Sequence, residues 1–536
     1  MSADADVIVV GSGPAGAQAA ETLVEHGCRV LMLDTGTTAA PDAAAPPGAF
    51  LDLRRHDRAQ HRYFLGDDFS GVPLARLGAA PQVTPPRRHV LQLAAGYAGI
   101  LADNFAALES HALGGLGAAW GAVSFPFTDG ELRQAGFAPA DLRPAYERVA
   151  RRIGICGAHD DTAPWIGPLE SLQPPLPLDH NASALLAAYT RQRAALHRRR
   201  VRVGRPMLAA LSQPLDERPA HDLADMDFWG DSGGSVYRPE LTVRRLQRRD
   251  TFRYAPGWFV ARFCESSDGR VHVTARAVAD GAERTFTARQ VFLAAGALGT
   301  TRIVLESFRE TAREVPLVCN AHLYVPCVHL RQLGRPHSER CHSLAQLSML
   351  HDPTGDGSAL VQAQMYSYRS LLLFRLLKES PLPARDSLWI MRALAPAFVI
   401  WALEEEDRPA DGRFCRLAPC ADGGTVLEVV APDSPDVEAQ RRDSQGALLW
   451  ATRRLGAWPI RRVHSGPGSS LHYGGQFPMS ERDEPFTTDA TGRLQGTRQV
   501  FIGDGSAFRY LPAKGLTFTL MANADRVACA MARCGR

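Results

Sequence analysis

Glycines at fixed spacing near the start of the chain are the first residues that could do chemistry. The hexamer Gly11-Ser-Gly-Pro-Ala-Gly16 follows the apolar run Asp6–Val10 and precedes apolar residues at helical spacing. In such a strand–turn–helix, Gly11 permits the tight turn, Gly13 lets the backbone approach a pyrophosphate, and Gly16 lets helix and strand pack closely. The helix N-terminus offers free N–H groups and partial positive charge to phosphates. The hexamer therefore predicts a dinucleotide site.

An acidic residue, Asp34, ends the second predicted strand, Val30–Leu33. A carboxylate at this point accepts hydrogen bonds from the hydroxyls of the adenosine ribose. It disfavours a 2′-phosphate, so we do not expect NADP. The alternative is a glycine turn without a ligand, which the flanking strands and the acidic residue argue against.

A second strand–turn–helix near the end of the chain indicates which dinucleotide binds. Val500–Asp504 is an apolar strand that ends in an acidic residue and is followed by Gly505, and Leu511–Gly515 precedes the helical segment Leu516–Ala530. This helix brings another positive N-terminus to the cofactor, which suits the negative charge of a reduced flavin. We therefore predict FAD rather than a soluble nicotinamide cofactor, with Gly505 and Thr517 among the residues that contact it.

Further strands must hold these turns in place. Alternation over Val271–Ala288 predicts paired strands, which lead into the buried strand Val291–Ala297 and its glycine turn. Ala397–Ala402 and Thr425–Val430 are typical of strands in a large sheet, and Ser370–Lys378 is typical of a packed helix.

Length and composition limit the class of protein. A chain of 536 residues exceeds the usual size of one hydrophobic core, so two lobes are expected. The net charge of +3, from 60 basic and 57 acidic residues, gives no reason to expect nucleic acid or an anionic membrane as partner. The most apolar later stretch, Leu388–Leu403, is interrupted by Arg392 and Pro396, and we predict no membrane span.

Location and metal binding are predicted from the N-terminus and the cysteines. Only Met1–Ala5 precede the first strand, which leaves no room for a signal peptide. None of the ten cysteines falls in a Cys-x-x-Cys pair or has zinc-ligand spacing. We expect reduced thiols, a cytoplasmic location and no metal.

Four segments, taken in order, resemble the glucose–methanol–choline oxidoreductase family and bracket nearly the whole chain. They are Gly11–Asp34, Leu113–Gly121, Val291–Arg302, and His472–Met479 continuing through Asp504 to Ala522. The last segment is the most specific, whereas the lobe between the segments matches only loosely. The resemblance implies an α/β fold, with a Rossmann-like FAD-binding domain and a substrate-binding domain on a large, mostly antiparallel sheet.

The resemblance also divides the chain. It implies a discontinuous FAD-binding domain of residues 1–155, 245–315 and 465–536. The substrate-binding domain would then comprise residues 156–244 and 316–464.

By resemblance, Gly114, Gly115 and Trp120 lie along the flavin, Asp504 contacts FAD, and His472 is the active-site histidine. A neutral imidazole can accept the hydroxyl proton of an alcohol while hydride leaves the same carbon for flavin N5.

This chain departs from the family pattern in two places. The family has Asn or His as a second catalytic residue where this chain has Gly515, which carries no side chain. Thr517, His464 or Lys514 could supply the missing polar contact, and the sequence does not choose among them. The histidine that binds FAD covalently in some sugar oxidases of the family is Ala119 here, so FAD is expected to bind non-covalently.

These features predict an FAD-dependent oxidase or dehydrogenase of an alcohol, with a sugar, cyclitol or related metabolite as the small-molecule substrate. The electron acceptor, oxygen or another, stays open. One alternative keeps the flavin but uses it in a lyase or in a reductase of carbon–carbon double bonds. Another is an FAD-binding protein whose active site has decayed, which the glycine at 515 motivates.

Overall fold

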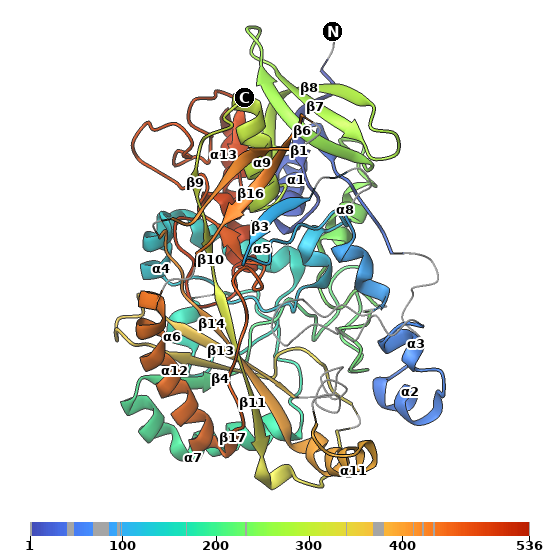
Figure 1. The fold of residues 1–536 in the computed structure, drawn as a ribbon, viewed down its shortest axis with the longest axis vertical. Helices are drawn as coiled ribbons and strands as arrows, with labels where there is room; N and C mark the ends of the chain where they lie inside the picture. The colour runs from blue at the N-terminus through green and yellow to red at the C-terminus, as the bar shows by residue number, and fades with distance from the viewer. Residues whose placement is uncertain are drawn as a thin grey trace.

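The computed structural model of the chain describes residues 3–39, 48–67, 85–93, 97, 99–167, 169–230, 233–338, 340–367, 380–410, 412–420, 423–432 and 435–534. The predicted helix Ser370–Lys378 lies outside these residues. Figure 1 shows a mixed sheet in the upper half of the molecule and a large antiparallel sheet in the lower half, with both chain ends near the top.

The mixed sheet has seven strands in the order β5-β2-β1-β8-β7-β6, with β20 also paired to β8. Its strands are β1 (Ala5–Val10), β2 (Val30–Leu33), β5 (Phe252–Ala255), β6 (Trp258–Glu265), β7 (Val271–Ala277), β8 (Glu283–Leu293) and β20 (Val500–Ile502). The predicted strand pair within 271–288 is confirmed as β7 and β8, which are antiparallel. β1 runs parallel to both β2 and β8, as the first strand of a dinucleotide-binding fold does.

The continuous apolar run of β1 is explained by burial on both faces. Val7 and Val9 belong to one hydrophobic core with the helices α1 (Pro14–Glu25) and α13 (Thr517–Cys534), while Ile8 and Val10 belong to another. A strand covered on both faces needs apolar residues at every position rather than at alternate ones. The first layer of the fold therefore follows directly from local sequence.

The large antiparallel sheet has the order β17-β11-β14-β13-β12-β4, with β18 also paired to β11. Its strands are β4 (Val201–Gly204), β11 (Ala321–His329), β12 (Leu347–His351), β13 (Val361–Ser367), β14 (Phe398–Glu405), β17 (Ala457–Pro459) and β18 (Val463–His464). One face is apolar and packs on the helices α7 (His180–Arg198) and α12 (Pro435–Leu455), which lie beside the sheet in Figure 1. This confirms the predicted fold class.

A four-stranded sheet consists of β3 (Ile100–Asp103), β16 (Thr425–Val430), β15 (Phe414–Pro419) and β9 (Val315–Pro316). The segment Thr425–Val430 is a strand as predicted, but it belongs to this smaller sheet and not to the large one. Its partner β3 comes from a part of the chain more than 300 residues earlier, and pairing at that separation leaves no local signal. Because the small sheet takes strands from both predicted domains, the domain boundaries stay a prediction.

Short elements complete the described chain. They are α2 (Phe50–His56), α3 (His61–Phe64), α4 (Asp129–Ala135), α5 (Pro139–Ile153), α6 (Ala163–Ile166), α8 (Pro239–Leu246), α9 (Ala297–Phe308), α11 (Ala384–Leu394), η2 (Pro85–Leu91), η3 (Gly115–Ala119), η4 (Leu330–Gln332), η5 (Ala395–Ala397), η6 (Gly505–Ala507), and the strand pair β10 (Val318–Cys319) and β19 (Tyr473–Gly474). Within the described ranges, no helix combines the length and the apolar character needed to cross a bilayer.

Candidate active site

One cavity of about 450 Å³ connects the first glycine turn to His472. Most of the residues predicted for the site line it: Gly11, Gly13, Asp34, Gly115, Trp120, His472, Asp504, Gly505 and Thr517. The two others, Gly16 and Gly114, do not line the cavity but contact residues that do, Gly11 and Ser12. A cavity of this size lies within the range of small-molecule and cofactor sites.

The glycine turn leaves room for a ligand on one side and none on the other. A Cβ on Gly11 would lie 2.5 Å from the carbonyl oxygen of Ala294, and one on Gly16 would lie 1.9 Å from the carbonyl oxygen of Gly11. A Cβ on Gly13 would meet no heavy atom within 4 Å, because that position faces the cavity. The turn therefore fits a pyrophosphate approached by backbone N–H groups.

Three helix N-termini converge on this cavity. α1 begins beside Gly13, α9 begins after Gly296, and α13 begins at Thr517, and all three starting points line the cavity. Each helix N-terminus carries partial positive charge. Together they suit both the phosphates of a dinucleotide and the negative charge of a reduced flavin.

Asp34 lines the cavity and is held by two hydroxyl groups. Its carboxylate accepts hydrogen bonds from the Ser12 hydroxyl and, at 2.9 Å, from the Tyr254 hydroxyl. The Ser12 oxygen in turn accepts the Gly114 N–H at 2.9 Å, which ties the second glycine segment to the first. Burial raises the pKa of Asp34 to about 6, and the hydrogen bonds from Ser12 and Tyr254 oppose that rise.

The second glycine segment wraps along the cavity wall. Gly114 and Gly115 have positive φ angles of 89° and 55°, which L-residues with side chains rarely adopt. The Trp120 indole N–H donates to the Tyr237 carbonyl at 2.8 Å, which fixes the ring at the cavity.

Asp504 and Gly505 shape the cavity from the C-terminal segment. The Asp504 carboxylate accepts hydrogen bonds from the Thr300 hydroxyl at 2.5 Å and from the Ser506 N–H at 3.0 Å. A Cβ on Gly505 would lie 2.4 Å from the Tyr473 carbonyl oxygen. Gly505 therefore allows the strand that follows His472 to pack directly against the turn after Asp504.

The backbone around His472 is tightly specified. Leu471 has a positive φ of 65°, a rare conformation for a residue with a branched side chain. His472 is followed at once by β19, which pairs with β10. Burial lowers the pKa of His472 to about 4, so its imidazole is neutral near pH 7.

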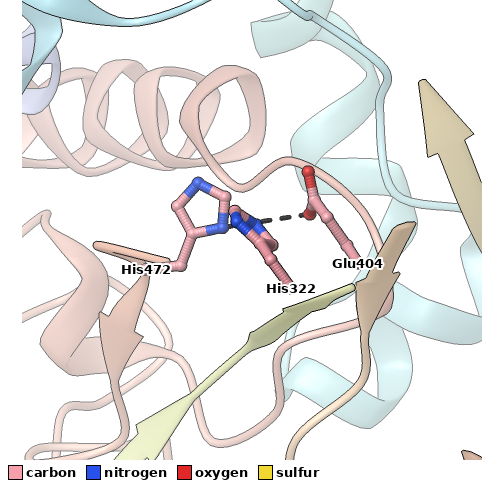
Figure 2. Close-up of side chains that lie close together, drawn as sticks. All are labelled: His322, Glu404 and His472. Atoms are coloured by element: carbon pink, nitrogen blue, oxygen red, sulfur yellow. Dashed lines mark ion pairs between the residues drawn. The ribbon is translucent and has the colours of Figure 1, made fainter. Parts of the chain in front are cut away.

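Two residues that the sequence analysis missed, His322 and Glu404, face His472 (Figure 2). They are directly paired across β11 and β14, on the face of the large sheet turned away from α7 and α12. The distance between His472 Nδ1 and Glu404 Oε2 is 3.9 Å, and the His322 and His472 rings are nearly perpendicular with centroids 5.8 Å apart. Alternation along each strand sets their face, but only the register brings them opposite each other.

Burial also shifts the ionisation of these two groups. It raises the pKa of Glu404 to about 8, although the Lys514 ammonium opposes the shift. The pKa of His322 falls to about 3 through burial and the nearby His472. Near pH 7, His322 and His472 are therefore neutral, and the Glu404 carboxyl group beside them is mostly protonated.

The three candidates for the missing second polar contact have different positions. Thr517 lines the cavity at the start of α13. His464 is exposed on β18 and does not line the cavity. The Lys514 ammonium is buried, with an ion pair to Glu131 at 2.8 Å.

Comparisons with known proteins agree with this geometry. Residues 5–112 match the family model described as pyridine nucleotide-disulphide oxidoreductase. The chain is 29% identical over 166 residues to paromamine 6′-oxidase of Streptomyces fradiae; the match spans 29% of this chain and 24% of that protein. The crystal structure of pyridoxine 4-oxidase from Mesorbium loti matches with a TM-score of 0.57 and 14% identity, covering 98% of this chain and 99% of that one.

The last match extends the shared fold over nearly the whole chain, including the large sheet and the C-terminal segment. These matches support the resemblance to the glucose–methanol–choline oxidoreductases that the four sequence segments indicate. Because the chain spans only about a quarter of the curated relative, that likeness does not carry the relative's activity with it. The matched domain and the two named oxidases support FAD as the cofactor of this chain.

Proposed function

We propose that this protein uses FAD to oxidise an alcohol of a small molecule to a carbonyl, with His472 as the general base. The observation that carries the proposal is a cavity that joins the glycine turn to a largely buried, neutral imidazole. When bound, FAD supplies the hydride acceptor.

The protein's own part is to take the proton of the hydroxyl group. With a pKa near 4, the imidazole of His472 is unprotonated at neutral pH and can accept that proton. The ring nitrogen that does not face Glu404 points away from the cluster in Figure 2, and we assign it as the acceptor.

For the substrate we propose a polar, hydroxyl-bearing metabolite such as a sugar, a cyclitol or a related compound. Polar side chains of the large sheet, His322, Glu404 and Tyr366, line the cavity near His472. One relative is named as an oxidase of paromamine and the solved structure as an oxidase of pyridoxine, which supports polar alcohols as the first compounds to test.

The test is an anaerobic panel of alcohols added to purified holoprotein and read by flavin absorbance. Paromamine, pyridoxine, simple sugars and cyclitols form the first panel. A substrate alcohol should bleach the oxidised flavin, and peroxide formation in air would identify oxygen as the acceptor. Turnover without bleaching would instead indicate a lyase, and neither would indicate a decayed site.

Two further proposals concern organisation and location. We keep the division into an FAD-binding domain of residues 1–155, 245–315 and 465–536 and a substrate-binding domain of the remainder, supported by the mixed and antiparallel sheets. A cytoplasmic location rests on the cysteine spacing, and fractionation of cells that express the full chain would test it.

A further inference from the structure

We propose that Glu404 is a positioning residue for His472: its carboxylate, held by His322, which Tyr324 orients in turn, orients the imidazole and stabilises the imidazolium formed when the alcohol gives up its proton. This inference rests on the proposed oxidation and assigns a role to residues outside the matched motifs.

The first observation is a set of three buried atoms that have no hydrogen-bond partner within the described part of the chain. They are His322 Nε2, Glu404 Oε2 and His472 Nδ1. One nitrogen of each histidine and one carboxylate oxygen of Glu404 all lie within 4.8 Å of one another. Buried polar atoms are nearly always hydrogen-bonded, so three unpartnered atoms that face each other are expected to satisfy one another. The 3.9 Å between His472 Nδ1 and Glu404 Oε2 needs only a shift of about 1 Å to become a hydrogen bond.

The second observation sets the direction of these hydrogen bonds. His322 Nδ1, the ring nitrogen outside this set, lies 3.2 Å from the Tyr324 hydroxyl. If that hydroxyl donates to Nδ1, the proton of the neutral His322 is on Nε2, which then donates to Glu404. His472 Nδ1–H donates to the same carboxylate, which can accept both bonds. When Glu404 is ionised, as it is above its pKa of about 8, this arrangement satisfies all three atoms and leaves His472 Nε2 as an acceptor.

The energetic reason for a carboxylate at this point is the charge that the reaction creates. The hydroxyl proton moves to His472 Nε2 as the C–H electron pair leaves as hydride, so a neutral imidazole becomes an imidazolium in a buried site. Burial makes that cation unfavourable, and an opposite charge within about 4–6 Å offsets the cost. Glu404 can supply this charge, because its Oε2 lies 3.9 Å from His472 Nδ1.

The groups that face Glu404 permit it to ionise. Lys514 favours the charged form, and the other titratable neighbours are His322, Tyr324 and Tyr366. A Cβ on Gly515 would lie 3.9 Å from Glu404 Oε1, so the absence of a side chain there leaves space beside the carboxylate. Glu404 and His472 are close enough to titrate as a coupled pair.

The experiment is anaerobic stopped-flow reduction of the flavin in Glu404→Gln holoprotein, with the best alcohol of the panel and across pH. We expect the limiting rate to fall about 10²–10³-fold while the apparent substrate affinity changes little, because the variant loses the anion but keeps the shape. In the parent the rate should rise with pH through an apparent pKa near 8, as Glu404 ionises, and this rise should disappear in the variant. Glu404→Asp should recover part of the rate.

Two further variants keep the inference testable if the Glu404→Gln protein fails to fold. Tyr324→Phe, at an exposed residue, should lower the rate in the same direction by a smaller factor and displace the same limb of the pH profile. Glu314→Gln is the matched control, because this exposed acid pairs with Arg416 away from the cavity, and it should reduce at the parent rate.

Parent-like rates and pH profiles in both Glu404→Gln and Tyr324→Phe would overturn the inference while bleaching still supports alcohol oxidation. Stoichiometric zinc in the parent that is lost in Glu404→Gln would also overturn it, because the three atoms would then be metal ligands. Failure of the parent to bleach with any alcohol would instead contradict the proposed function.

Discussion

The two ends of the cavity are built in opposite ways. At the cofactor end, contiguous residues from β1 to Asp34 make the site largely from backbone, and the glycines act by having no side chain. At the other end, the side chains of His322, Glu404 and His472 come from β11, β14 and the segment before β19. The comparison shows that a phosphate site can be assembled from one short segment, whereas the acid–base site requires the registry of distant strands.

The largest expected effect tests the claim that the cofactor end depends on missing side chains. Gly16→Ala should destabilise the fold by about 3 kcal/mol or more, since its Cβ would lie 1.9 Å from a backbone oxygen that cannot rotate away. Gly13→Ala is the matched control, because its Cβ would enter open cavity. It should fold normally and weaken FAD binding by about tenfold. Thermal unfolding and flavin titration measure the two effects, and equal stability of the two variants would contradict this account.

The next effect belongs to the other end of the cavity. His472→Ala should lower the rate of flavin reduction about 10²–10⁴-fold, because it removes the proton acceptor. The purified variant should remain yellow, since the glycine turn and Asp34 are untouched. Reduction at the parent rate would show that another group takes the proton.

A smaller effect concerns how the cofactor end responds to pH. Burial raises the pKa of Asp34 in the folded, FAD-free protein to about 6, from an ordinary value of 3.8. Between about pH 4 and pH 6 the unfolded chain has lost this proton while the folded chain keeps it, so stability should fall as pH rises through that window. The loss is at most ~3 kcal/mol for a shift of this size. Thermal unfolding of the FAD-free protein against Asp34→Asn, which does not titrate, should show the difference; parallel curves would argue against it.

The smallest effect separates nearness in sequence from nearness in space. His464 precedes His472 by only eight residues, but it is exposed on β18 and does not line the cavity. His464→Ala should therefore reduce flavin within about twofold of the parent and change stability by less than ~0.5 kcal/mol. A rate loss comparable to that of His472→Ala would mean that the segment is arranged differently during turnover.

Motifs predicted much of the site because their chemistry is local. The glycine turn, Asp34, the second glycine segment and the residues around Asp504 all reach the cavity or shape its wall. The strand Thr425–Val430 was recognised but assigned to the wrong sheet, since its pairing with β3 depends on chain segments far apart. His322 and Glu404 were missed for the same reason: neither lies in a motif, and each looks like an ordinary strand residue.

Local sequence alone determined the dinucleotide turn and the alternation of strand and helix around it, because backbone geometry and hydrophobic periodicity act over a few residues. The candidate histidine, His472, came from the family resemblance of the segment that contains it. Only the tertiary structure decided what surrounds that histidine. The register of β11 on β14 places the His322 imidazole opposite the Glu404 carboxyl group. Burial then lowers the pKa of His322 and raises the pKa of Glu404. Desolvation and strand register are properties of the assembled chain, so no single segment encodes them.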